Sequence, residues 1–168
     1  FFFSFGFCFT QSDKKTYFTK KIEDNLSPVI DGEISDEAWN QVEWSSGFIQ
    51  FQPEENTQPS NQTKYKLLYD NNAVYIFVKS INNPNEIVNR LRSSDKLVGV
   101  AIMIGIDSNT DKIPSFMFCL SCAVTHVDMF ASGKGEKEDE SWNAVWYSRT
   151  KIDDDGWNAE LKIQFSQS

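Results

Sequence analysis

The sequence predicts an all-β protein, an antiparallel and jelly-roll-like β-sandwich with one or two short helices. Three observations favour this class. Several segments alternate apolar and polar residues with a period of two, which is typical of strands. Turn residues separate these segments at short intervals, and helical patterns are scarce. The chain has 168 residues, 40% of them apolar, which is enough for one domain with its own core.

Local patterns place the first elements. Residues 35–40 predict one short helix, because a capping serine opens the segment and acidic residues fill its first turn. Residues 65–69 and 74–78 alternate as strands. The segment between them, 70–73, contains residues that tolerate a positive φ, which predicts a hairpin. A second short helical turn is expected at residues 84–89.

The second half of the chain predicts a run of strands. Residues 100–106 are nearly all apolar, which indicates a central strand. Further strands are expected at residues 116–122, 127–130 and 142–150. Residues 133–140 have the composition of a solvated loop, and residues 153–156 form a predicted tight turn. Residues 157–165 then alternate strictly, which predicts one face in the core and the other in water.

Charge and composition exclude several functions. The chain has 16 Lys and Arg against 24 Asp and Glu, a net charge of −8, and no Lys/Arg run longer than two. Nucleic-acid binding needs clustered positive charge, so this class is disfavoured. One histidine and three cysteines leave little for a zinc site. His126 and Asp128 share a strand face, but no nucleophile is placed beside them, so no catalytic residue is predicted.

The two ends of the chain look cut. Residues 1–9 hold six of the fourteen Phe, an apolar run too short to span a bilayer. We interpret residues 1–10 as the remnant of a secretory signal peptide, cleaved before Gln11. An acylated Cys8 and a buried strand are the alternatives. Residues 11–168 are the predicted β-sandwich, which we expect to be truncated at its C-terminus because the chain stops directly after a strand.

The spacing of Cys119 and Cys122 is that of a C-x-x-C motif, which in other settings indicates redox or metal chemistry. Here the motif lies in a predicted strand. Positions i and i+3 of a strand point to opposite faces, so the two sulfurs do not meet easily. Two buried free thiols are therefore expected.

Four segments, in order, resemble known domains. Pro28–Trp39 (PVIDGEISDEAW) resembles the opening of carbohydrate-binding module family 9 domains, and Leu68–Val78 resembles the family's hairpin. Asp155–Ile163 is similar to its closing strand. Ser141–Trp146 is similar to an element of an uncharacterised bacterial outer-membrane protein family that carries this module at its N-terminus. The resemblance covers about residues 17–165.

The resemblance implies a non-catalytic carbohydrate-binding module of a larger exported bacterial protein involved in polysaccharide binding or breakdown. The location it implies is the periplasm, outer membrane or exterior of a Gram-negative bacterium, and the partner is an oligo- or polysaccharide. The alternative is a periplasmic structural or adaptor domain. Such a domain would dock on a C-terminal outer-membrane β-barrel of the same protein and would have no sugar site.

The resemblance also suggests site residues. Family members hold a terminal sugar between tryptophans, and Trp142 and Trp146 lie four apart on one predicted strand face. We therefore expect these two as the sugar platform, with Arg92 and Asn143 as polar partners. Asn143 and Arg149 fall on the opposite strand face unless a bulge intervenes. The alternative is that both tryptophans belong to the core, as is expected of Trp39 and Trp157, while Trp44 is left open.

A calcium site is the second candidate. Asp107, Asn109 and Asp111 have the D-x-N-x-D spacing that begins a calcium loop. The segment lacks the glycine and the closing acid of an EF-hand, so that motif is excluded. Because the modules that this chain resembles can carry a structural calcium, these three residues are candidate ligands, with residues 153–155 as another acidic source. The alternative is a solvated turn, and no other cofactor is expected.

Overall fold

The computed structural model shows two β-sheets packed face to face. It describes residues 15–50, 55, 57–87, 101–106, 116–122, 126–132, 136–139 and 145–165. The five-stranded sheet has the order β1-β2-β3-β9-β8, and the four-stranded sheet has the order β4-β5-β6-β7. β1 runs parallel to β2 and the other pairs are antiparallel. This arrangement confirms the all-β prediction.

The elements have the following bounds. The strands are β1 (Lys20–Lys21), β2 (Thr63–Tyr69), β3 (Ala73–Ile81), β4 (Ala101–Ile106), β5 (Phe116–Ser121), β6 (His126–Ser132), β7 (Glu136–Asp139), β8 (Trp146–Asp153) and β9 (Gly156–Gln164). The 3₁₀ helices are η1 (Asp24–Leu26) and η2 (Glu37–Gln41), and residues 84–87 form a helical turn. Short helices are therefore found at both predicted segments, and residues 88–89 of the second lie outside the described part of the chain. None of the helices described is long and apolar enough to cross a membrane.

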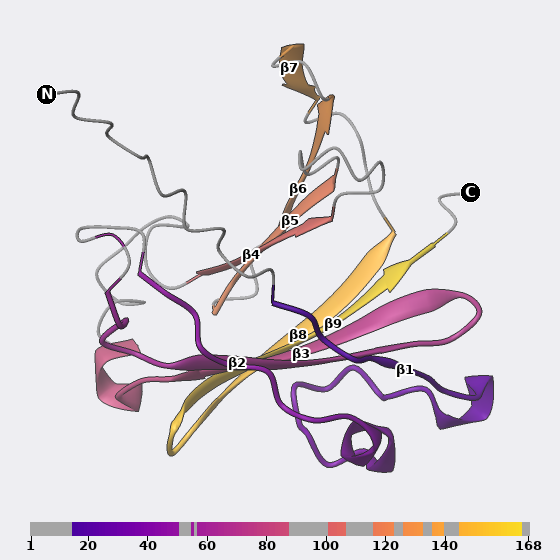
Figure 1. Cartoon of the computed structure of the whole chain (residues 1–168), viewed down its shortest axis with the longest axis horizontal. Coiled ribbons are helices and arrows are strands. Elements are labelled where there is room, and N and C mark those ends of the chain that lie inside the picture. The colour runs from indigo at the N-terminus through magenta and orange to yellow at the C-terminus, as the bar shows by residue number, and fades with distance from the viewer. Residues whose placement is uncertain are drawn as a thin grey trace, which may run out of the picture.

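The N-terminal segment forms a third layer. Figure 1 shows η1 and η2 on one side of the five-stranded sheet and β4–β7 on the other. One core fills the space between the sheets and includes Ile76, Phe118, Leu120, Trp157 and Leu161. A second core lies under the N-terminal segment and includes Trp39, Leu68, Tyr75 and Phe77. The expectation that Trp39 and Trp157 are core residues is confirmed, since they are 0% and 1% exposed.

This third layer corrects the prediction for the last strand. The odd positions of β9 do face the core between the sheets, as the alternation predicts. Two of the even positions do not face water, because Asn158 is 7% exposed and Glu160 is 0% exposed, while Lys162 is half-buried. The N-terminal segment covers this face, and it lies more than a hundred residues away in the sequence. The sequence of β9 alone therefore does not indicate that this segment covers it.

Two further expectations are corrected. β4 pairs with β5 alone among the described strands, so it lies at an edge and not at the centre. Its isoleucines face the core while Met103 is 58% exposed. The sequence does not indicate this alternation, because the residues on both faces are apolar or glycine. The predicted loop at residues 133–140 contains β7, which pairs with β6. Cys119 and Cys122 are buried free thiols, as predicted.

Asp70 closes the β2–β3 hairpin at the predicted turn. Its Oδ1 accepts hydrogen bonds from the backbone N–H groups of Asn72 (2.7 Å) and Ala73 (2.8 Å). Its Oδ2 accepts from the hydroxyls of Tyr75 (2.7 Å) and Ser27 (2.9 Å). Burial raises the pKa of the Asp70 carboxyl, but these hydrogen bonds outweigh burial and hold the pKa below its ordinary value.

Replacement of Asp70 by alanine is expected to lower the free energy of unfolding by about 3 kcal/mol, because the Asn72 and Ala73 N–H groups and the Tyr75 hydroxyl lose their acceptor in a closed turn. The Ser27 hydroxyl keeps the Asp24 carbonyl oxygen as its acceptor. Urea denaturation followed by tryptophan fluorescence measures the loss. Asp70→Asn keeps one acceptor oxygen and is the matched control, with a smaller expected loss. An alanine variant as stable as the wild type would show that the turn does not depend on this carboxylate.

Candidate functional site

The structure places Trp146 in the core between the sheets. Its side chain is 9% exposed and its ring lies edge-on to Phe118, with centroids 5.4 Å apart. Ser148 and Thr150 share this inner face, and the Thr150 hydroxyl donates to the Cys122 carbonyl oxygen at 3.1 Å. This burial favours the core role that the sequence left open for Trp146. Its expected sugar contact stays a prediction that the burial disfavours.

The other predicted site residues lie outside the described part of the chain. They are Arg92, Trp142 and Asn143 of the sugar site and Asp107, Asn109 and Asp111 of the calcium site. Within the described residues, no three His, Cys, Asp or Glu side chains are grouped closely enough to hold a metal ion.

The acidic turn at residues 153–155 has a different partner. The Lys79 ammonium lies 3.0 Å from Asp153 Oδ2 and 3.3 Å from Asp155 Oδ2. Burial lowers the pKa of Lys79, and the two carboxylates outweigh burial and raise it. The carboxylates of this turn therefore hold a lysine, which makes it a poor alternative source of calcium ligands.

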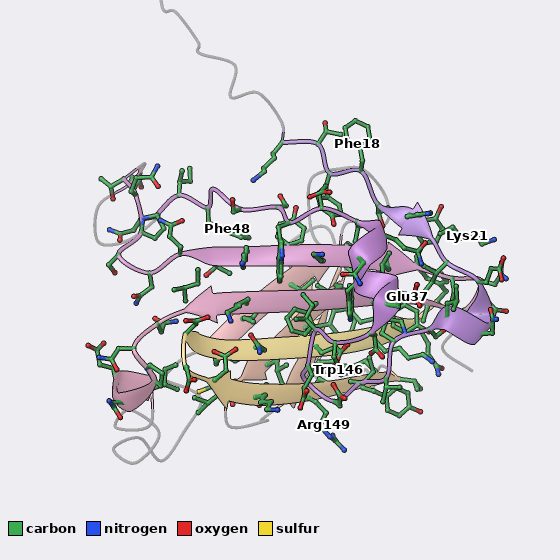
Figure 2. The ribbon with its side chains drawn as sticks, turned by 90° about the horizontal axis from the view of Figure 1, so that it is seen from below. Phe18, Lys21, Glu37, Phe48, Trp146 and Arg149 are labelled. Atoms are coloured by element: carbon green, nitrogen blue, oxygen red, sulfur yellow. The ribbon has the colours of Figure 1, made fainter. Side chains whose placement is uncertain are left out.

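The outward face of β8 carries an aromatic ring among cations. Tyr147 is 53% exposed and Arg149 is exposed, since both point away from the core that Trp146 enters. The Arg149 guanidinium donates to the Ser148 carbonyl oxygen at 3.0 Å. Lys162 of β9 lies directly opposite Tyr147 in the register. Figure 2 looks onto this outer face and shows Arg149 extending beyond the strand at the edge of the sheet.

These side chains line a groove. Its volume is about 320 Å³, and it lies between residues 28–30 of the N-terminal segment and strands β8 and β9. The lining residues are Pro28, Ile30, Tyr147, Ser148, Arg149 and Lys162. The groove therefore combines the exposed ring and hydroxyl of Tyr147 with guanidinium and ammonium donors, while the Ser148 side chain points to the inner face.

Other hollows fit a sugar less well. Two cavities between the sheets, of about 500 and 540 Å³, are lined mainly by aliphatic and aromatic side chains, which offer few partners for hydroxyl groups. A groove of about 490 Å³ runs past Trp44. There the Lys64 ammonium lies 4.4 Å from the centroid of the Trp44 ring, so a cation already covers one face of that ring.

A buried carboxylate holds the wall of the groove in place. Glu160 Oε2 accepts from the backbone N–H groups of Asp31 (3.0 Å) and Gly32 (2.9 Å), and Oε1 accepts from Trp39 Nε1 (3.1 Å). Gly32 has φ 83°, and a Cβ there would lie 3.3 Å from Lys151 Cβ, so the segment packs closely on β8. Glu160 thus ties the segment carrying Pro28 and Ile30 to the sheet.

Comparison with known proteins assigns the chain to a family. The family described as "Carbohydrate family 9 binding domain-like" matches residues 30–168. The chain belongs to this family. The match begins at the segment that Glu160 anchors and runs through β8 and β9, and it confirms the resemblance found in the sequence. Family 9 modules are non-catalytic, so the domain is not an enzyme.

Solved structures confirm the family 9 fold. A family 9 module from Caldicellulosiruptor kristjanssonii in complex with cellotriose is 23% identical, with a TM-score of 0.59, over 91% of this chain and 69% of that chain. A module from the same organism in complex with glucose is 22% identical, with a TM-score of 0.61, over 91% and 71%. At these identities the likeness shows the β-sandwich fold. No curated protein matches the chain.

Sequence reasoning did not single out Tyr147 and Lys162, which line this groove. The alternation in the sequence does place Arg149 on the face opposite Trp146, and the structure confirms this. The same alternation puts Tyr147 beside Arg149. The missing information was which of the two faces is buried.

Proposed function

We propose that this family 9 domain binds carbohydrate in the groove between residues 28–30 and strands β8 and β9. One observation supports this location above others: the exposed Tyr147 ring stands beside the Arg149 and Lys162 donors. Family membership supports the ligand class. The two similar solved modules hold cellotriose and glucose, which supports a glycan as the ligand here.

The chemistry of the groove suits a sugar ring. The flat face of Tyr147 can cover the apolar C–H side of the ring, while Arg149 and Lys162 donate to oxygens on its edge. A volume of about 320 Å³ is at the small end of ligand pockets, so we expect one sugar residue in the groove and the rest of the chain in solvent.

Tyr147→Ala is expected to weaken glycan binding about tenfold, because the stacking surface is lost. Calorimetric titration of the chain against a panel of soluble oligosaccharides, including cellotriose, measures the change. Tyr147→Phe keeps the ring and is the matched control, with binding close to wild type. Thermal melts of both variants establish that they are folded.

A second pair of variants tests the tryptophans. If Trp142→Ala abolishes binding and Tyr147→Ala leaves it unchanged, the site lies at Trp142 and the location proposed here is wrong. Trp146→Phe should keep affinity while lowering stability, because Trp146 packs against Phe118. Repeating the titrations with and without calcium tests whether binding depends on a calcium ion, for which Asp107, Asn109 and Asp111 are the proposed ligands.

We further propose that the domain belongs to a larger exported bacterial protein that binds or breaks down polysaccharide, in the periplasm, in the outer membrane or outside the cell. The resemblance of Ser141–Trp146 to an outer-membrane family and the Phe-rich residues 1–9 support this context. N-terminal sequencing of the exported protein should find Gln11 first. A different first residue would contradict the proposed cleavage site.

The adaptor function is the second candidate. It is supported by β4, which pairs with β5 alone among the described strands and exposes Met103. An unpaired strand edge can add a strand from another region, such as an outer-membrane β-barrel of the same protein. This candidate predicts no saturable binding across the glycan panel, so the same titrations distinguish the two functions.

A further inference from the structure

Two cations in the groove have no acidic partner among the residues that the structure describes. In the described part of the chain, the ion pairs are Lys79 with Asp153 and Asp155, and Lys151 with Glu33. Arg149 and Lys162 are absent from these pairs, although the chain has a net charge of −8 and offers 24 carboxylates. The groove is therefore lined by two cations that form no ion pair within the described residues.

The acid that lies opposite Arg149 in the β8–β9 pairing does not neutralise Arg149 or Lys162. Arg149 lies opposite Glu160 on β9. Glu160 is fully buried, and its two oxygens accept from Asp31, Gly32 and Trp39 under the N-terminal segment. The Arg149 guanidinium is exposed and donates to its own strand's backbone. The buried acid and the exposed cation are thus engaged separately.

The two cations and the ring stand close together. Tyr147 and Lys162 face each other across β8 and β9, and such cross-strand partners have Cβ atoms about 5 Å apart. Arg149 is two residues along the same outward face of β8. The Lys162 ammonium lies 5.4 Å from the centroid of the Tyr75 ring, which places it over the outer face of the sheet.

We propose that the groove selects sugars that carry a carboxylate, namely uronic acid residues of a glycan. The Arg149 guanidinium matches a carboxylate with two parallel N–H···O bonds. The Lys162 ammonium supplies the second positive charge, and Tyr147 stacks on the C–H side of the same ring. This inference rests on the proposed carbohydrate site and adds the chemical class of its ligand.

The test compares acids with their neutral esters. Trimers of galacturonate and of glucuronate are titrated into the whole chain beside their methyl esters, which keep the ring and lose the charge. At least one acid is expected to bind about tenfold more tightly than its ester. Added salt should lower the affinity for the acid but not the affinity for the ester. The double variant Arg149→Gln, Lys162→Gln should bind acid and ester equally.

Lys151→Gln is the matched control. Lys151 lies on the same strand face, but it pairs with Glu33 and does not line the groove. The Lys151→Gln variant should keep the preference for the acid over the ester. This result would exclude a general effect of net charge on binding. Melting curves confirm that the variants are folded.

The outcomes separate the two proposals. If esters and neutral sugars bind as tightly as the acids, or if the preference survives the double variant, the uronate inference is overturned while sugar binding at Tyr147 stands. If no acid, ester or neutral sugar binds, both proposals are overturned.

Discussion

Gly156→Ala is expected to destabilise the domain by about 4 kcal/mol, from backbone strain and overpacking together. Gly156 opens β9 with φ 148°, where side chains are rarely tolerated. A Cβ there would lie 2.1 Å from the Ser80 carbonyl oxygen and 2.7 Å from the Asn82 nitrogen. These are backbone atoms at the end of β3, so relief would require the β3–β9 pairing to open. Urea denaturation measures the loss.

Gly47→Ala separates strain from close contact. Gly47 also has a positive φ of 80°, but the nearest atom to its added Cβ is Lys15 Nζ at 3.6 Å, the far end of a flexible side chain. The expected cost is therefore backbone strain alone, about 1 kcal/mol. Equal losses in the two variants would contradict the role given to the contact between Gly156 and β3.

Local patterns predicted those parts of the fold that local chemistry determines. The β2–β3 hairpin was predictable because Asp70 and its neighbours carry the turn within a few residues. The strand at β9 was predictable from its alternation. What covers each face was not, because the partners are distant in the sequence. The apolar run of β4 predicts a strand but does not indicate whether it pairs on one side or two.

Prediction of the candidate site from sequence has the same limit: local patterns do not indicate which strand face is covered. Alternation correctly separates Trp146 from Arg149, since neighbouring residues of a strand point to opposite faces. It cannot say which face the second sheet covers. That depends on Phe118 of β5, which packs on Trp146. The family 9 opening segment was recognisable from its residues, but its attachment to Glu160 required the fold.

Glu160 is expected to make the domain less stable as the pH rises. Burial raises the pKa of its carboxyl from 4.5 to about 7, although the donors Gly32, Asp31 and Trp39 lower it in part. The folded protein therefore holds a proton that the unfolded chain releases near pH 4.5. This contribution is fully present below pH 4.5, and it is lost as the pH rises to about 7. The change corresponds to about 3 kcal/mol.

Urea denaturation at several pH values between 4.5 and 8 measures this dependence, and Glu160→Gln isolates it. The glutamine cannot titrate, so the difference in stability between wild type and variant should follow the proton on Glu160 while the contributions of other groups cancel. The variant also loses one acceptor oxygen for three N–H donors, which lowers its stability at every pH. If the difference does not vary with pH, Glu160 is ionised throughout this range. The carboxylate would then hold the N-terminal segment as a charged acceptor of all three hydrogen bonds.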